Sequence, residues 1–196
     1  NRVFLNDVKD NGVSVVLSID ASYSMRGKQI EIAREITATL FESVKGIPKV
    51  EIQGNVWASR CAVVGITKIN TLSDVQMVSI SKDGFCETPT HVALEYSAQM
   101  LKNMKGAKKL LIMITDGVPN SYYENGQRMS RDTMTKICKK SLKAALRTTS
   151  NVIFVVVDEY HDGGALKRMR DLFGAKRIVY AHNMHDAAKH TLKHLK

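Results

Sequence analysis

Three oxygen-bearing side chains follow the first strong apolar run of the chain at alternate positions. Asp20, Ser22 and Ser24 come directly after residues 13–19, whose β-branched and apolar residues predict a buried strand. A helical pattern begins after Gly27, so one carboxylate and two hydroxyls lie in the turn between strand and helix. Clustered oxygen ligands suit a hard divalent cation such as Mg²⁺. The alternative is a helix N-cap, where Asp and Ser are favoured for backbone reasons alone.

Apolar runs and helical periodicities alternate along the rest of the chain. Only Ala58, Ser59 and Arg60 separate the second and third runs, so we expect these two to pair as an antiparallel hairpin. Together the elements predict an α/β fold: a doubly wound, Rossmann-like, mostly parallel six-stranded sheet with one antiparallel edge strand and helices on both faces. The expected strands are 13–19, 50–57, 61–68, 108–115, 151–157 and 177–180, with a short extended piece at 75–80, and the expected helices are 28–45, 90–103, 130–148, 165–173 and 185–195.

Length and composition indicate one globular domain over residues 1–196, and the opening at Asn1 is consistent with a segment excised from a longer chain. No apolar run approaches the roughly 20 residues needed to cross a bilayer. Cys61, Cys86 and Cys138 have no metal-ligand spacing and predict reduced thiols, so we expect a cytoplasmic protein. The formal net charge of +10 favours acidic partners, either proteins or nucleic acid.

Further candidate ligands occur at two other expected element ends. Asp116 follows the strand 108–115, and Thr88 lies in the turn before the helix 90–103. In an open α/β sheet, ligands bind beyond the carboxyl ends of the strands, where the strand order reverses. We therefore expect Asp116 and Thr88 to join Asp20 if their strands are neighbours. Thr90 is expected to cap its helix rather than to bind a ligand.

This set resembles the metal-ion-dependent adhesion site of the von Willebrand factor A domain, with Asp20-Ala-Ser22-Tyr-Ser24, then Thr88, then Asp116 in order. The resemblance implies that Ser22, Ser24 and Thr88 bind Mg²⁺ directly, or Mn²⁺ in its place, and that Asp20 and Asp116 act directly or through water. It also implies that the cation binds an Asp or Glu carboxylate of a partner protein. Tyr23, in place of a small residue, and Glu87, beside Thr88, depart from the family pattern and bear on metal affinity.

The C-terminal half resembles intracellular bacterial and phage members of that family which accompany MoxR-type AAA+ ATPases or magnesium and cobalt chelatases. The segments that carry this likeness are 114–120, 155–158 and 172–174. It implies an adaptor or substrate-recognition component of an AAA+ ATPase. The alternative within this likeness is the non-ATPase subunit of a metal chelatase.

The expected helix 130–148 carries basic residues with only Asp132 opposing them. Such a run is either a solvated helix face or a surface for an acidic partner, and nucleic-acid binding is the competing function. Catalysis by the chain alone is not expected, because no general base stands beside the cation ligands and no P-loop is present. Trp57 is expected in the core, and His91 and His161 at the surface. The basic residues are Arg131, Lys136, Lys139, Lys140, Lys143 and Arg147.

Overall fold

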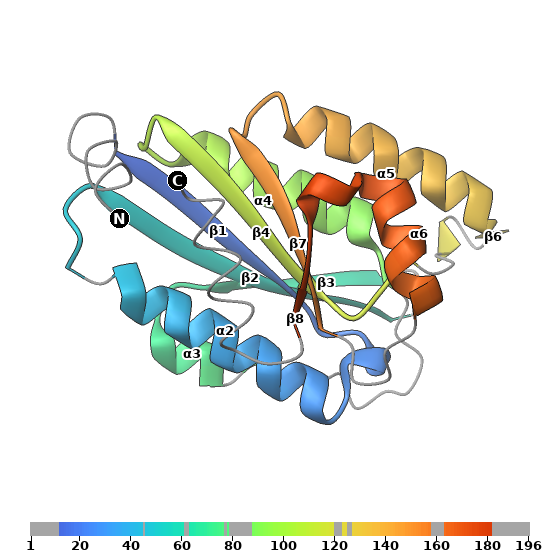
Figure 1. The fold of residues 1–196 in the computed structure, drawn as a ribbon, viewed down its shortest axis with the longest axis horizontal. Coiled ribbons are helices and arrows are strands. Elements are labelled where there is room, and N and C mark those ends of the chain that lie inside the picture. Colours follow the sequence, from blue (N-terminus) through green and yellow to red (C-terminus); the bar gives the residue numbers. More distant parts are fainter. Residues whose placement is uncertain are drawn as a thin grey trace.

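The computed structural model contains a six-stranded sheet with the strand order β3-β2-β1-β4-β7-β8 (Figure 1). The pairs β1–β2, β1–β4, β4–β7 and β7–β8 are parallel, and β2–β3 is antiparallel at the edge. This confirms the predicted sheet. The structure describes residues 12–44, 46–60, 63–76, 78, 88–119, 123–124, 127–157 and 163–181. The strands are β1 Val13–Asp20, β2 Val50–Arg60, β3 Val63–Ile69, β4 Lys108–Thr115, β7 Asn151–Val157 and β8 Ile178–Ala181.

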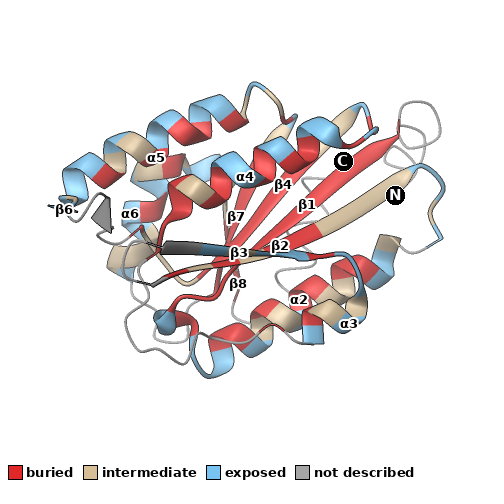
Figure 2. Cartoon of the chain, turned by 180° about the vertical axis from the view of Figure 1, so that it is seen from behind, coloured by how far each residue is buried: buried red, intermediate tan, exposed pale blue. Residues whose placement is uncertain are grey.

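Helices cover both faces of the sheet (Figure 1). Helices α2 and α3 lie on one face, and α4, α5 and α6 lie on the other; Figure 2 shows their buried sides turned toward the sheet and their exposed sides turned outward. A two-stranded hairpin, β5–β6, precedes α5. The bounds are η1 Tyr23–Met25, α2 Lys28–Val44, α3 Leu72–Gln76, α4 Thr90–Asn103, β5 Tyr123–Glu124, β6 Gln127–Arg128, α5 Arg131–Ala145, α6 Gly163–Phe173 and η2 Ala175–Arg177.

The central strand β1 is buried along its whole length, as a parallel strand covered on both faces must be. Its odd-numbered residues, from Val13 to Ile19, belong to the apolar cluster shared with α2. Val16 belongs to the cluster shared with α4, α5 and α6. Successive side chains of a strand point to opposite faces, so the even-numbered residues of β1 face α4.

Polar contacts hold α4 against β1 and β2. The Ser18 hydroxyl donates to Asn55 Oδ1 at 2.9 Å, and Asn55 Nδ2 donates to Ser97 Oγ of α4 at 2.9 Å. Beyond the C-terminus of α4, the backbone N–H of Gly106 donates to Ser14 Oγ at 2.8 Å. A Cβ atom at position 106 would meet the Ser14 nitrogen at 2.5 Å, so only glycine permits this approach.

The edge hairpin is longer than the sequence indicated. Ala58, Ser59 and Arg60, expected to connect the two strands, belong to β2 and pair with residues 63–65 of β3. The prediction was wrong because strand pairing continues through residues that have little strand preference of their own. Cys61, the expected first residue of the second strand, lies outside the described residues.

Residues 72–76 form helix α3, so the extended piece expected at 75–80 is wrong at Val75 and Gln76, and Val78 belongs to no strand. Residues 77, 79 and 80 lie outside the described residues. The Asp74 carboxylate accepts hydrogen bonds from the backbone N–H groups of Asn70 and Thr71, both at 2.9 Å, and the Asp74 N–H donates to Thr71 Oγ1 at 3.2 Å. These bonds form a reciprocal cap of the capping-box type, which starts a helix. They also lower the pKa of Asp74 below its usual value.

Three side chains test the smaller predictions. Trp57 is buried, as expected, but His91 is only 8% exposed, so its placement at the surface was wrong. The reason is that His91 lies in the first turn of α4, on the side that packs inward. Cys138 is buried in α5, and burial raises the pKa of its thiol to about 12, which fits an unreactive packed cysteine. Cys86, His161 and the expected helix 185–195 lie outside the described residues.

Candidate metal centre

The strand order reverses between β1 and β4. Helix α2 leads from β1 to β2 on one side, whereas α4 leads into β4 on the other side of β1. The carboxyl ends of β1 and β4 therefore border the crevice in which open α/β sheets bind ligands. Asp20 is the last residue of β1, and Asp116 directly follows β4. The structure thus brings together the two chain segments that the sequence placed at one edge.

Asp20 is fully buried and accepts hydrogen bonds at both carboxylate oxygens. The backbone N–H of Ser22 donates to Oδ1 at 2.8 Å, and the Thr115 hydroxyl donates to Oδ2 at 2.7 Å. These bonds fix the orientation of the carboxylate and tie the end of β1 to the end of β4.

The charge of Asp20 is costly in this position. Burial and the neighbouring Asp116 carboxylate raise the pKa of Asp20 from 3.8 to about 7, although its hydrogen bonds to Ser22 and Thr115 act in the opposite direction. Two carboxylates held close together in a partly dry crevice repel each other. A cation bound between them would relieve that repulsion.

The two serines lie side by side. Ser22 Oγ and Ser24 Oγ are 3.1 Å apart; Ser22 is buried and Ser24 is exposed, so the pair runs from the interior to the solvent. Ser22 precedes the 3₁₀ turn η1, but its side chain makes no capping hydrogen bond, and α2 begins only at Lys28. The hydroxyls are therefore not used as an N-cap, which was the alternative reading of this segment.

The other two residues of the predicted set are Asp116, directly after β4, and Thr88, two residues before the start of α4. Asp116 is half-buried, and its charge acts on Asp20. Thr88 is 3% exposed, and its carbonyl accepts a hydrogen bond from the Thr90 N–H at 2.8 Å at the start of α4. Pro89 occupies the N-cap position and Thr90 is the first helical residue, so the expected capping role of Thr90 was wrong. Pro89 has no side-chain oxygen, and α4 begins without a side-chain cap.

Thr115 is a residue of the candidate site that the sequence did not single out. Its hydroxyl holds the Asp20 carboxylate, and it stands next to Asp116. A signal was present: β1 and β4 pair with Ile19 opposite Ile114, so the next residues along both strands, Asp20 and Thr115, are neighbours. A buried threonine opposite a buried aspartate predicts a hydrogen bond between them.

The donor set fits a hard cation rather than a soft one. Within the described ranges, no group of three or more His, Cys, Asp and Glu side chains could hold a metal ion. A metal at this edge would therefore depend on hydroxyl oxygens together with Asp20 and Asp116. All-oxygen ligation by a few carboxylates and neutral oxygens is the pattern of Mg²⁺.

A match to a family model decides the assignment. Residues 14–191 match the model of the von Willebrand factor type A domain. The chain belongs to this family. Domains of the von Willebrand factor A family are protein-interaction modules, and the doubly wound sheet described above is their fold. No curated protein matches the chain in sequence.

Solved structures of two bacterial pilins and of a conserved hypothetical bacterial protein share the fold. The D319A mutant of the PilB minor pilin from Streptococcus sanguinis matches with a TM-score of 0.70 and 14% identity, over 95% of this von Willebrand factor A domain and 61% of that chain. The adhesive tip pilin GBS104 from Group B Streptococcus agalactiae matches with a TM-score of 0.68 and 10% identity, over 94% of this domain and 100% of that chain. The conserved hypothetical protein BatB from Bacteroides thetaiotaomicron matches with a TM-score of 0.62 and 17% identity, over 94% of this domain and 98% of that chain.

At these identities the likeness extends to the fold alone. The domain spans 61% of the length of the PilB chain. In the part of the domain that the structure describes, no helix is both long and apolar enough to cross a membrane.

Proposed function

We propose that this domain binds an acidic residue of a partner protein through a Mg²⁺ ion at the β1–β4 edge. The observation that carries the proposal is the pair of serine hydroxyls, 3.1 Å apart, beside a buried Asp20 that shares its site with Asp116. Ser22, Ser24 and Thr88 would hold the ion, with Asp20 and Asp116 acting directly or through water. When bound, Mg²⁺ supplies positive charge to attract a carboxylate.

The protein groups have separate tasks in this proposal. Thr115 orients Asp20, and the Ser22 N–H holds the other oxygen of the same carboxylate. The two serines extend from that buried carboxylate to the solvent, where a partner can approach. Because the hydroxyls are neutral, they leave more of the cation's charge for the partner than further carboxylates would.

Metal binding is tested directly by electron paramagnetic resonance of Mn²⁺ added to the purified chain. Ser22→Ala and Thr88→Ala should each weaken Mn²⁺ binding at least about tenfold, which is the usual order of effect for loss of a ligand or its supporting contact. Ser43→Ala is the control, because Ser43 is an exposed serine of α2 whose hydroxyl bonds the carbonyl of Thr39 in its own helix. Equal Mn²⁺ affinity in all four proteins would overturn the proposal.

For the partner, we propose an AAA+ ATPase or chelatase-like assembly in the cytoplasm that uses this domain as adaptor or substrate-recognition component. The segments 114–120, 155–158 and 172–174 support this choice through their likeness to such members. In this assembly the domain itself would not be catalytic. Capture from native extract on the immobilised domain, with Mg²⁺ or with chelator, should retain an ATPase in Mg²⁺ only. Retention that is indifferent to chelator would contradict the metal-dependent contact.

Nucleic-acid binding is the second candidate function, and the exposed basic face of α5 is the observation in its favour. Lys136, Lys139, Lys140 and Lys143 are all exposed along this helix. Binding through this face would weaken steeply as salt rises and would not require Mg²⁺. A labelled duplex whose affinity does not change between low and physiological salt would remove this candidate.

A further inference from the structure

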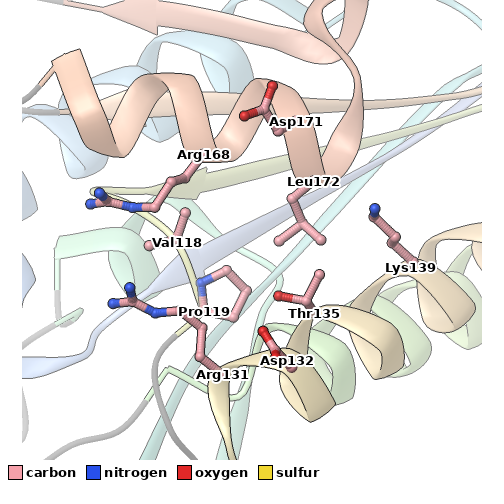
Figure 3. Close-up of a pocket in the computed structure, with 9 residues that line it drawn as sticks. All are labelled: Val118, Pro119, Arg131, Asp132, Thr135, Lys139, Arg168, Asp171 and Leu172. Atoms are coloured by element: carbon pink, nitrogen blue, oxygen red, sulfur yellow. The ribbon is translucent and has the colours of Figure 1, made fainter.

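A pocket of about 240 Å³ lies between α5, α6 and the loop after β4. Its apolar part comes from Val118, Pro119 and Leu172, and Figure 3 shows these side chains between the two helices. Val118 and Leu172 also pack against the core cluster beneath. The volume is below the roughly 300–1,000 Å³ of small-molecule sites, so the pocket suits one or two side chains rather than a cofactor.

Charged side chains surround this apolar part. Arg131 and Arg168 point to the same side of the pocket, and Lys139 lies at the opposite end (Figure 3). Arg131, Lys139 and Arg168 are exposed. Asp132 and Asp171 are the acidic residues of the lining. Cationic groups therefore stand at both ends of an apolar depression.

The excess of positive charge extends beyond the pocket. Helices α5 and α6 together contain eight lysines and arginines and two aspartates. A field of this sign attracts anionic partners over several ångströms and raises their association rate. The same field disfavours a basic or strongly cationic occupant.

We propose that the pocket between α5 and α6 binds an acidic polypeptide segment that inserts one or two aliphatic side chains between Arg131 and Lys139. The apolar surface of Val118 and Leu172 would cover the aliphatic anchor, and the basic ends would contact acidic residues on either side of it. A nucleic acid fits less well, because none of the described residues that line the pocket is aromatic and could stack on a base. None of the proposed metal ligands lines this pocket, so the contact should require no cation.

The test is a selection of random dodecapeptides displayed on phage against the whole chain in chelator, so that the metal site takes no part. The selected peptides should contain an aliphatic residue with Asp or Glu on both sides. Enrichment of peptides without acidic residues, or of none above background, overturns the proposal. A labelled duplex DNA that displaces the selected peptides and binds more tightly than they do also overturns it.

Variants locate the binding. The double variant Arg131→Glu and Lys139→Glu should lower the affinity for a fluorescein-labelled selected peptide at least about tenfold, since two charge contacts are reversed. Fluorescence anisotropy measures this affinity. Val118→Thr, which is nearly isosteric, should weaken it several-fold through lost apolar contact alone. The matched control is Lys102→Glu with Lys176→Glu, two exposed lysines outside the pocket. If the control pair weakens binding as much as the first pair, the contact is diffuse and the proposal fails.

Discussion

The two sides of strand β1 differ in polarity. All four side chains that face α2 are apolar, whereas three of the four that face α4 are polar. On the α2 side, Val13, Val15, Leu17 and Ile19 contribute only apolar contact. On the α4 side, Ser14, Ser18 and Asp20 each make a directional hydrogen bond, with Gly106, Asn55 and Thr115 respectively.

The difference teaches how one strand serves two purposes. Apolar packing supplies stability without fixing the position of a helix to a fraction of an ångström, whereas hydrogen bonds between buried groups are directional and costly to break. Helix α4 begins two residues after Thr88 and is held by directional bonds, from Asn55 to its Ser97 and, beyond its C-terminus, from Gly106 to Ser14. We infer that the polar side of β1 fixes the position of α4 relative to Asp20.

The largest loss of stability is expected where the backbone at Gly106 approaches the backbone of β1. Gly106→Ala would place a Cβ atom 2.5 Å from the Ser14 nitrogen and 2.6 Å from the Val13 carbonyl carbon. Because neither backbone atom can move freely, the free energy of unfolding should fall by more than about 3 kcal/mol in urea titrations. Gly65→Ala is the control, since nothing lies within 4 Å of the added atom there. Similar stability of the two variants would mean that α4 does not need this close approach.

The second effect concerns the buried amide. Asn55→Ala removes the bond to the Ser18 hydroxyl and the bond to Ser97 and leaves those groups without their partner, so stability should fall by about 2 to 3 kcal/mol. Mn²⁺ affinity should fall as well, because α4 loses a contact that positions Thr88. Unchanged affinity in a folded Asn55→Ala protein would separate the polar side of β1 from the metal site.

The third effect follows from the raised pKa of Asp20. A carboxyl group whose pKa is near 7 in the folded protein and near 3.8 in the unfolded chain binds its proton more tightly when folded. It therefore adds stability at low pH that is lost as the pH rises from about 4 to about 7. In chelator, Asp20→Asn should remove most of this pH dependence. At pH 8 its free energy of unfolding should exceed that of the wild type by about 2 kcal/mol.

Saturating Mg²⁺ should reverse that ranking, because the cation stabilises only the protein that keeps the Asp20 carboxylate. Thermal melts at pH 5 and pH 8, with chelator and with Mg²⁺, give the four measurements. A wild-type melting temperature that does not respond to Mg²⁺ at pH 8 would contradict the metal site.

The smallest effect belongs to the apolar side. Ile36→Val in α2 removes one methylene group from a fully packed position, which should cost about 1 kcal/mol. Mn²⁺ affinity should stay at the wild-type value, because α2 carries no residue of the proposed ligand set. A loss of affinity comparable with that of Asn55→Ala would remove the distinction between the two sides of β1.

The sequence predicted the elements whose signal is local and continuous. Helix Thr90–Asn103 and strand Lys108–Thr115 were predicted with the observed bounds, because apolar periodicity and Gly106 define them within a few residues. Asp20, Ser22 and Asp116 were likewise placed at one sheet edge, because they follow the carboxyl ends of expected strands. The position of a residue along a strand does not predict the hydrogen-bond partner of its side chain.

The missed features all depend on contacts between distant segments or on caps. Asn55 lies in a strand with no local sign that Ser18 and Ser97 converge on it, 37 and 42 residues away. The reciprocal cap of Thr71 and Asp74 turned an expected extended piece into a helix. At the start of α4, Pro89 took the capping position that a side-chain preference would give to Thr90.

The position of β1 in the sheet has a consequence for the order of folding during synthesis. The bond that Gly106 donates to Ser14 spans 92 residues, and the bond that Thr115 donates to Asp20 spans 95. A nascent chain that ends before Lys108 can pair β1 with β2 but leaves its other edge without a neighbour. Contacts of such sequence separation form late and slowly. Until β4 has emerged from the ribosome, the bond between Thr115 and Asp20 cannot form and β1 lacks its second neighbouring strand, so truncations upstream of residue 108 should be handled as incomplete folding units.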